Sequence, residues 1–160
     1  MAIVANTNLT PWQLRPLASD ESSSRGYTHT AQICANDLTA SATTQTLILN
    51  GLKIGDVIAK VATRVKTPFT GGGLTTMTMS VGNTGSATAY TSAQNVFTSG
   101  TVELYMVTAI QALTATTNLT VLFTGSGNVV LATVGEIEIF VQLIRASELE
   151  LATTPRTLTK

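Results

Sequence analysis

The sequence is poor in charged side chains. Nine basic and nine acidic residues cancel, and charged residues make up only 11% of the 160 residues, against about 25% in an ordinary soluble domain. Tight binding to nucleic acid or to an anionic membrane depends on clustered positive charge, so we expect neither as a partner. Low net charge lets copies of a chain associate without strong repulsion. The composition therefore indicates a subunit of an assembly.

Cysteine and histidine each occur only once, as Cys34 and His29. One cysteine cannot form an intrachain disulfide. A zinc site or a catalytic triad needs several such side chains close together in space. We therefore interpret His29 as a half-buried strand histidine and Cys34 as a small buried thiol. We expect no catalytic site, no metal site, no cofactor and no small-molecule substrate.

Three further patterns resemble functional sites but have simpler interpretations. Glu136 and Glu138 are two residues apart, so they share a strand face as a general acid and base could, yet an outward face of alternating charge explains them. The segment Gly71-Gly72-Gly73 lacks the Lys-Ser/Thr of a phosphate loop and indicates a flexible turn. The basic residues Lys60, Arg64 and Lys66 are typical of the solvated face of a strand.

Long apolar runs are also missing. No stretch reaches the roughly 18 apolar residues of a membrane span, and the N-terminal MAIVANTNLTPWQLRPL lacks the basic and apolar regions of a signal peptide. We therefore expect synthesis in the cytoplasm and no membrane partner. The length suits one domain, which would bury about two-thirds of its unfolded surface.

Threonine and a two-residue apolar period are abundant instead. There are about thirty threonines, and threonine is β-branched and favours strands. Seven or eight short segments alternate between apolar and polar residues and are separated by Gly, Asn and Pro turn signals. This pattern predicts an all-β protein, an antiparallel β-sandwich or jelly roll. The expected strands are residues 27–34, 45–50, 57–66, 74–81, 102–108, 119–124 and 136–144, with short candidates at 88–91 and 129–134.

Residues 55–82 suggest how these strands are organised. Residues 57–66 and 74–81 both alternate, and the link between them contains Pro68 and three glycines. A proline does not continue a central ladder, and glycines accept a positive φ, so the chain can reverse there. We predict that these two segments form the central β-hairpin of the fold.

The two ends of the chain differ from the central domain, which we assign to residues 26–146. Residues 1–25 have no strand or helix period but contain four large apolar side chains, Leu9, Trp12, Leu14 and Leu17. Such residues are typical of an extended arm that orders when it docks on a partner or on another subunit. In the alternative interpretation, Trp12 covers the domain's own core. Residues 147–160 are expected to form a tail with one helical turn near Ser147.

Several runs of the sequence resemble small structural proteins of tailed bacteriophages. These are VIAKVATRVKTPFTGGGLTTMTMSVGNTG, the Thr/Ser/Ala-rich loop after it, NLTVLFTGSGN and the closing GEIEIFVQLI. The resemblance covers about residues 45–145. It implies a non-enzymatic virion component. The size of this chain and its N-terminal arm are similar to those of capsid decoration (cement) proteins. By that resemblance the chain would be made in the host cytoplasm and act on the capsid surface, as a homotrimer bound to the major capsid protein.

Two other functions fit the same features. A phage tail or fibre component would share the fold and the low charge, and location in the particle would distinguish it from a cement protein. A carbohydrate-binding β-sandwich would need exposed aromatic side chains over a groove. The candidates for that role are Trp12, Tyr27, Tyr90 and Tyr105.

Overall fold

The computed structural model describes six segments of the chain and one single residue. Backbone alone is described for residues 12–13, 15–16 and 102–106, and backbone with side chains for residues 26–50, 52–98, 113 and 118–145. The predicted C-terminal tail, with its helical turn, lies outside these residues and stays a prediction.

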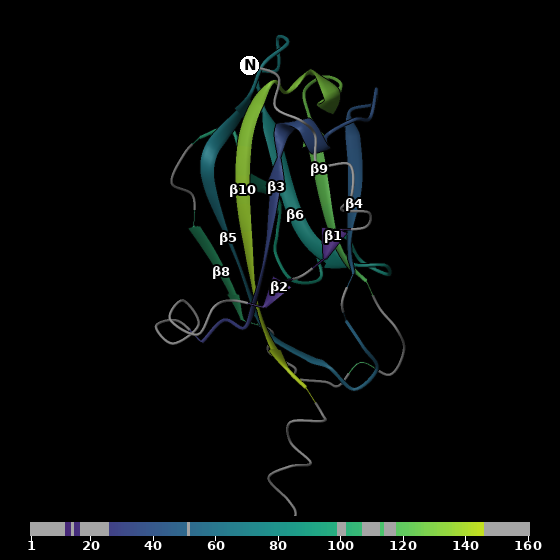
Figure 1. The fold of residues 1–160 in the computed structure, drawn as a ribbon. Coiled ribbons are helices and arrows are strands. Elements are labelled where there is room, and N and C mark those ends of the chain that lie inside the picture. Colours follow the sequence, from purple (N-terminus) through teal and green to yellow (C-terminus); the bar gives the residue numbers. More distant parts are fainter. Residues whose placement is uncertain are drawn as a thin grey trace, which may run out of the picture.

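The described residues form two five-stranded sheets and two short 3-10 helices (Figure 1). Sheet A has the strand order β1-β4-β9-β6-β7, and sheet B has the order β2-β3-β10-β5-β8. The all-β sandwich predicted from the sequence is confirmed. The elements are β1 (Trp12–Gln13), β2 (Arg15–Pro16), β3 (His29–Cys34), η1 (Ala35–Asp37), β4 (Thr44–Asn50), β5 (Val57–Thr70), β6 (Met77–Asn83), β7 (Gln94–Asn95), β8 (Val102–Met106), β9 (Leu119–Gly125), η2 (Val129–Leu131) and β10 (Val134–Ile144).

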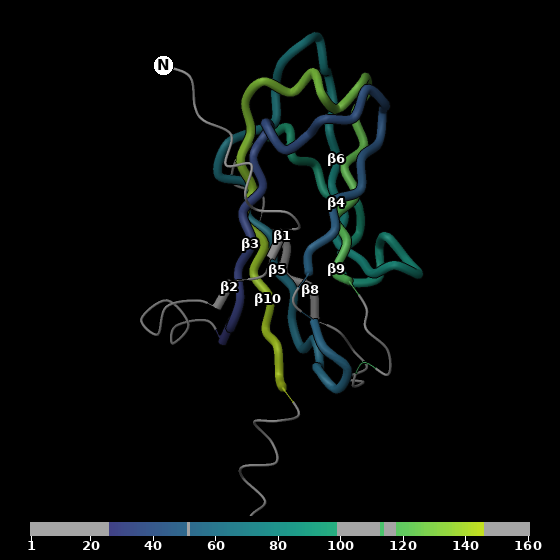
Figure 2. The backbone as a smooth tube through the Cα atoms, turned by 45° about the vertical axis from the view of Figure 1, so that its right-hand side comes forward, coloured from purple at the N-terminus to yellow at the C-terminus, as the bar shows by residue number. Residues whose placement is uncertain are grey.

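The connectivity is that of a jelly roll. Four antiparallel pairs, β3 with β10, β4 with β9, β5 with β8 and β6 with β7, form one long folded ribbon. The ribbon curls on itself so that β10 also pairs with β5 and β9 also pairs with β6. Except for β6 and β7, successive strands from β3 onward therefore lie in opposite sheets, and Figure 2 shows the two layers side by side. Two packed sheets joined in this way define the jelly roll.

The predicted central hairpin is wrong. Strand β5 pairs with β10 and β8, and β6 pairs with β9 and β7, so the two strands lie in different sheets. The two strands do not pair edge to edge. Instead their apolar faces meet across the core: Val61 and Val65 of β5 are buried, as are Met77 and Met79 of β6. The glycine-rich link carries the chain from one sheet to the other.

Pro68 lies inside β5 and not in the turn, because the ladder is interrupted there. Thr67 pairs with Glu136 and Thr70 pairs with Val134, so Pro68 and Phe69 together face a single residue, Gly135. This is a β-bulge, a position where a strand tolerates proline. The N–H group of Phe69 donates to the carbonyl of Val96 over 3.0 Å.

The core lies between the sheets and is closed at the bulge end by aromatic rings. Phe69 and Phe123 are fully buried with ring centroids 5.4 Å apart. The alternation predicted for β3, β4, β9 and β10 places their apolar side chains inward. Besides Phe123, the fully buried members are Ile33, Leu49, Leu119, Val121, Ile137, Ile139 and Val141.

Other parts of the predicted secondary structure differ in detail. Residues 88–91 form no strand, and a two-residue strand follows at Gln94–Asn95. The segment after Asn128 forms a 3-10 helix before β10 begins. Within the described part of the chain, no helix is long and apolar enough to cross a membrane.

Candidate interaction surface

His29 and Cys34 lie on the same strand but on opposite faces of sheet B. His29 is buried, with Nδ1 2.9 Å from Oγ1 of Thr28 and Nε2 3.4 Å from Nη2 of Arg145. Cys34 is half-buried on the outer side. The fold therefore does not bring the thiol and the imidazole together. The described residues also contain no group of three or more His, Cys, Asp or Glu side chains that could hold a metal ion.

The surroundings of Cys34 make its thiol a weaker acid than that of an ordinary cysteine. Burial raises the pKa of Cys34, and the nearby carboxylates of Asp37 and Glu136 raise it further. The Asp37 carboxylate accepts a hydrogen bond from the backbone N–H of Cys34 over 2.6 Å, and burial raises the pKa of Asp37 as well. Because the thiolate is the reactive form, this environment suits an inert structural cysteine.

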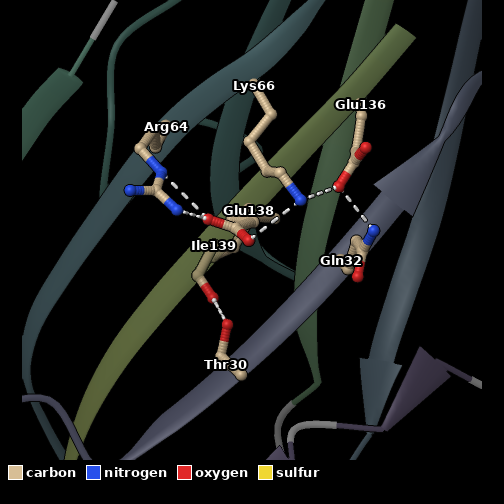
Figure 3. Close-up of polar contacts among 7 residues, drawn as sticks. All are labelled: Thr30, Gln32, Arg64, Lys66, Glu136, Glu138 and Ile139. Carbon is tan, nitrogen blue, oxygen red and sulfur yellow. Dashed lines mark hydrogen bonds and ion pairs between the residues drawn. The ribbon is translucent and has the colours of Figure 1, made fainter. Parts of the chain in front are cut away.

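The acidic pair of β10 forms ion pairs with two of the three basic residues of β5, Arg64 and Lys66, on the outer face of sheet B (Figure 3). The third, Lys60, is half-buried. Glu136 forms an ion pair with Lys66 and accepts a hydrogen bond from Gln32 over 2.6 Å. Glu138 accepts from Nε of Arg64 over 2.9 Å and lies 3.6 Å from Nζ of Lys66. We call Gln32, Arg64, Lys66, Glu136 and Glu138 the charged face. Its structure matches the predicted solvated strand face with alternating charge.

Two of the four aromatic candidates for sugar binding are buried. Tyr27 and Tyr90 are 7% and 8% exposed. The ring of Tyr27 packs against Phe140, with centroids 5.8 Å apart. The side chains of Trp12 and Tyr105 lie outside the described residues. Tyr27 and Tyr90 are therefore not available to stack on a sugar.

The outer face of sheet A has the opposite character from the charged face. Thr44 and Thr78 both pair with Thr124, and Thr46 pairs with Leu122, which also pairs with Ser80. Thr44, Thr46 and Thr124 are exposed, Leu122 is half-buried, and Ile48 is 43% exposed. We call this surface the neutral face: Thr44, Thr46, Ile48, Thr78, Leu122 and Thr124. No strand of sheet A contains a charged residue.

A loop limits the neutral face on one side. A side chain at Gly82 of β6 would collide with the backbone of Ser86 and Ala87, so the loop after β6 lies directly on the sheet there. Ser80 and Thr120 are correspondingly buried. The open part of the neutral face therefore lies toward the other end of β4, β9 and β6.

That other end of the sandwich carries a second uncharged surface, the apolar tip. Val130 and Leu131 of η2 are each 40% exposed, and Val134 at the start of β10 is 50% exposed. Leu131 packs directly on Gly72, which leaves no room there for a side chain. The glycine-rich link therefore packs against the tip.

The order of residues in the sequence indicates both uncharged surfaces, although the overall composition does not. No charged residue occurs in residues 67–102 or in residues 104–135. These runs include β6, β7, β9, η2 and the glycine-rich link. The few charged residues are therefore unevenly distributed: most of them lie in sheet B or near the two ends of the chain.

The predicted arm residues are described only in part. The backbone at Trp12–Gln13 runs parallel to β4, with Trp12 opposite Leu49, and that at Arg15–Pro16 runs antiparallel to β3. The arm thus adds two residues to the edge of each sheet. Leu9, Leu14 and Leu17 lie outside the described residues, and so does the side chain of Trp12. The docking role of these four residues and the proposed boundary of the arm stay predictions.

Comparisons with known proteins gave distant likenesses. No protein-family model and no curated protein matches the chain. A chain of the cyanophage Pam1 capsid asymmetric unit is similar at 23% identity and a TM-score of 0.49, covering 70% of this chain and 79% of that one. A chain of the capsid of Ralstonia phage GP4 is similar at 17% identity and a TM-score of 0.43, covering 72% and 84%.

Both similar structures are phage capsids. At identities and TM-scores this low, neither likeness assigns a role to this chain. Its function rests on its own residues.

Proposed function

We propose that the protein is a non-enzymatic structural component of a bacteriophage virion, a decoration or cement protein that binds the outer surface of the capsid. The observation that carries this proposal is the separation of charge between the two sheets. A solvated protein spreads charge over its surface, whereas one sheet of this sandwich has an outer face of threonine and aliphatic side chains and no charge.

Such a surface is suited to contact with another subunit of an assembly, while the contact with the shell would be made by the N-terminal arm. Interface centres are depleted in charged residues, and threonine and leucine lose little side-chain entropy when they are covered, in contrast to lysine or glutamate. The described residues do not favour enzyme chemistry. The thiol of Cys34 and the imidazole of His29 lie apart, and the carboxylates of Glu136 and Glu138 form ion pairs with lysine and arginine side chains.

The partner in this proposal is the major capsid protein, and the assembled form is a homotrimer. The N-terminal arm, with Leu9, Trp12, Leu14 and Leu17, would hold the shell, while the sandwich would brace neighbouring capsid subunits. A phage tail component remains the alternative role, because the same surfaces would serve it equally well.

Binding to shells tests the proposal. Purified protein is mixed with capsids that lack it, the particles are sedimented, and bound copies are located by electron microscopy. Density for the jelly roll on the outer shell surface is expected, together with a higher temperature of particle disruption. Density only on the tail would favour the alternative, and an absence of binding to both would refute a virion role.

A further inference from the structure

We propose that the neutral face is the surface through which copies of this chain contact one another around a symmetry axis. The inference rests on the proposed function, which includes an oligomer, and it adds the surface through which the subunits of that oligomer would touch. The occupant of the face is a second copy of the same chain, and not the capsid protein.

Charge selects this occupant. At the positions that lie on a rotation axis, each side chain faces the same side chain of another copy, because closed oligomers are symmetric. Any lysine or glutamate there would face its own like charge, whereas a foreign partner could supply the opposite charge. The part of a symmetric interface around the axis therefore favours uncharged side chains. The neutral face meets this condition at every position.

The shape of the face also suits contact between copies. Its residues lie in rows across three neighbouring strands, with Thr44, Thr124 and Thr78 in one row and Thr46 and Leu122 in the next. The strands are held by the buried side chains behind them, among which Leu49, Phe123 and Met79 are at most 1% exposed. A rigid face of short side chains loses little conformational freedom on contact.

The charged face is a poor competitor for the same role. Glu136 and Glu138 already have cationic partners within the chain, and covering these pairs would remove their hydration without providing new partners. That face is therefore expected to remain in water.

Two variants of opposite charge test the inference. The acidic variant is Thr46→Glu with Thr124→Glu, and the basic variant is Thr46→Lys with Thr124→Lys; both positions are exposed, so the sandwich should fold. Matched controls are Ile54→Glu and Ile54→Lys, in the turn before β5, where the side chain is 65% exposed and outside the neutral face. Circular dichroism checks folding, and native mass spectrometry with light scattering measures the oligomeric state.

The wild type and both Ile54 controls are expected to be oligomeric at micromolar concentration, and each charged variant alone to be monomeric. Mixing the acidic and basic variants is expected to restore an oligomer that contains both. A monomeric wild type, charged variants that stay oligomeric, controls that dissociate as well, or a mixture that stays monomeric would each overturn the inference.

Shell binding measured in parallel separates this inference from the proposed function. Wild-type protein that binds shells without self-association refutes the neutral-face contact and the trimer, and leaves the decoration role standing. Self-association through the neutral face without any binding to virion parts refutes the decoration role alone.

Discussion

The ring of Phe69 occupies the space that a side chain at Gly135 would need. A Cβ atom placed on Gly135 would overlap three atoms of that ring. Phe69 itself is fully buried and packs against Phe123 from the opposite sheet. The bulge between β5 and β10 thus places an aromatic side chain of one strand over a glycine of the next, and the ring closes that end of the core.

Replacing Gly135 with alanine should therefore destabilise the protein. The ring cannot move outward without opening the core, and overpacking of this kind costs about 1–3 kcal/mol. Urea unfolding followed by fluorescence or circular dichroism measures the change. Gly85→Ala is the matched control, because the nearest atom to its new methyl group would be Oδ1 of Asn83 at an ordinary 3.5 Å. Equal stability of the two variants would contradict the predicted overlap.

A buried hydrogen bond between Thr63 and Gln94 leads to a second prediction. The Thr63 hydroxyl donates to Oε1 of Gln94, both residues are at most 4% exposed, and Nε2 of Gln94 has no hydrogen-bond partner among the described residues. Thr63→Val removes the donor and leaves the buried Oε1 of Gln94 without it, which should cost about 1–3 kcal/mol. Adding Gln94→Met removes the amide too, so the double variant should recover most of that loss or exceed the wild type in stability.

Thermal and urea unfolding of the wild type, both single variants and the double variant form a mutant cycle for this pair. If the two single effects simply add, the buried bond does not couple these residues and the prediction is wrong.

The strands could largely be predicted from the sequence, but their partners could not. The alternation of apolar and polar residues in β10 and β4 shows which face of each strand is buried, because apolar side chains occupy the buried face. It contains no information on which sheet a strand joins. Residues 57–66 and 74–81 predict a hairpin because they are adjacent in sequence, but the apolar faces of these two strands instead meet across the core.

The candidate surface was harder to predict than the strands. Overall composition shows low charge, but the position of that charge in space requires the order of the strands. Once β9 is known to lie between β4 and β6, residues 67–102 and 104–135 can be recognised as the source of an uncharged sheet. Pro68 was misplaced for a related reason: the bulge opposite Gly135, which allows a proline inside the strand, exists only in the pairing with β10.

The thiol of Cys34 should react slowly with alkylating reagents at mildly alkaline pH. Its pKa is raised by burial and then by the carboxylates of Asp37 and Glu136, so at about pH 8 it contains less thiolate than a free cysteine does. Its rate of reaction with iodoacetamide, followed by mass spectrometry, should keep rising at pH values where that of a free cysteine has levelled off.

Asp37→Asn removes one of the negative charges that raise the pKa of the Cys34 thiol, while the amide oxygen can still accept from the Cys34 N–H. This variant should react faster at about pH 8, with its rate profile shifted to lower pH. Glu138→Gln is the control, because Glu138 is not among the groups that raise the pKa of Cys34. An unchanged profile in Asp37→Asn would show that the carboxylate does not act on the thiol.

The described backbone of the N-terminal arm pairs with the sandwich over two short stretches. Strands β1 and β2 contribute two residues each, at the outer edges of β4 and β3. The strands that hold the fold together are longer, and β10 alone pairs with both β3 and β5 over most of its length. Edge pairs this short stabilise a sheet weakly, and they can be replaced by other partners.

Deleting residues 1–20 should therefore leave the sandwich folded with an almost unchanged melting temperature, while binding to the shell is lost or much weakened. The apolar side chains of Leu9, Trp12, Leu14 and Leu17 could together contribute several kcal/mol to docking, at about 25 cal/mol per Å² of buried apolar area before ordering costs. Pro11 and Pro16 lower those costs by restricting the free arm. Calorimetry measures the first outcome and cosedimentation with shells the second. Truncated protein that decorates shells with wild-type affinity, or that no longer folds because Trp12 belongs to its own core, would show that the arm does not hold the partner.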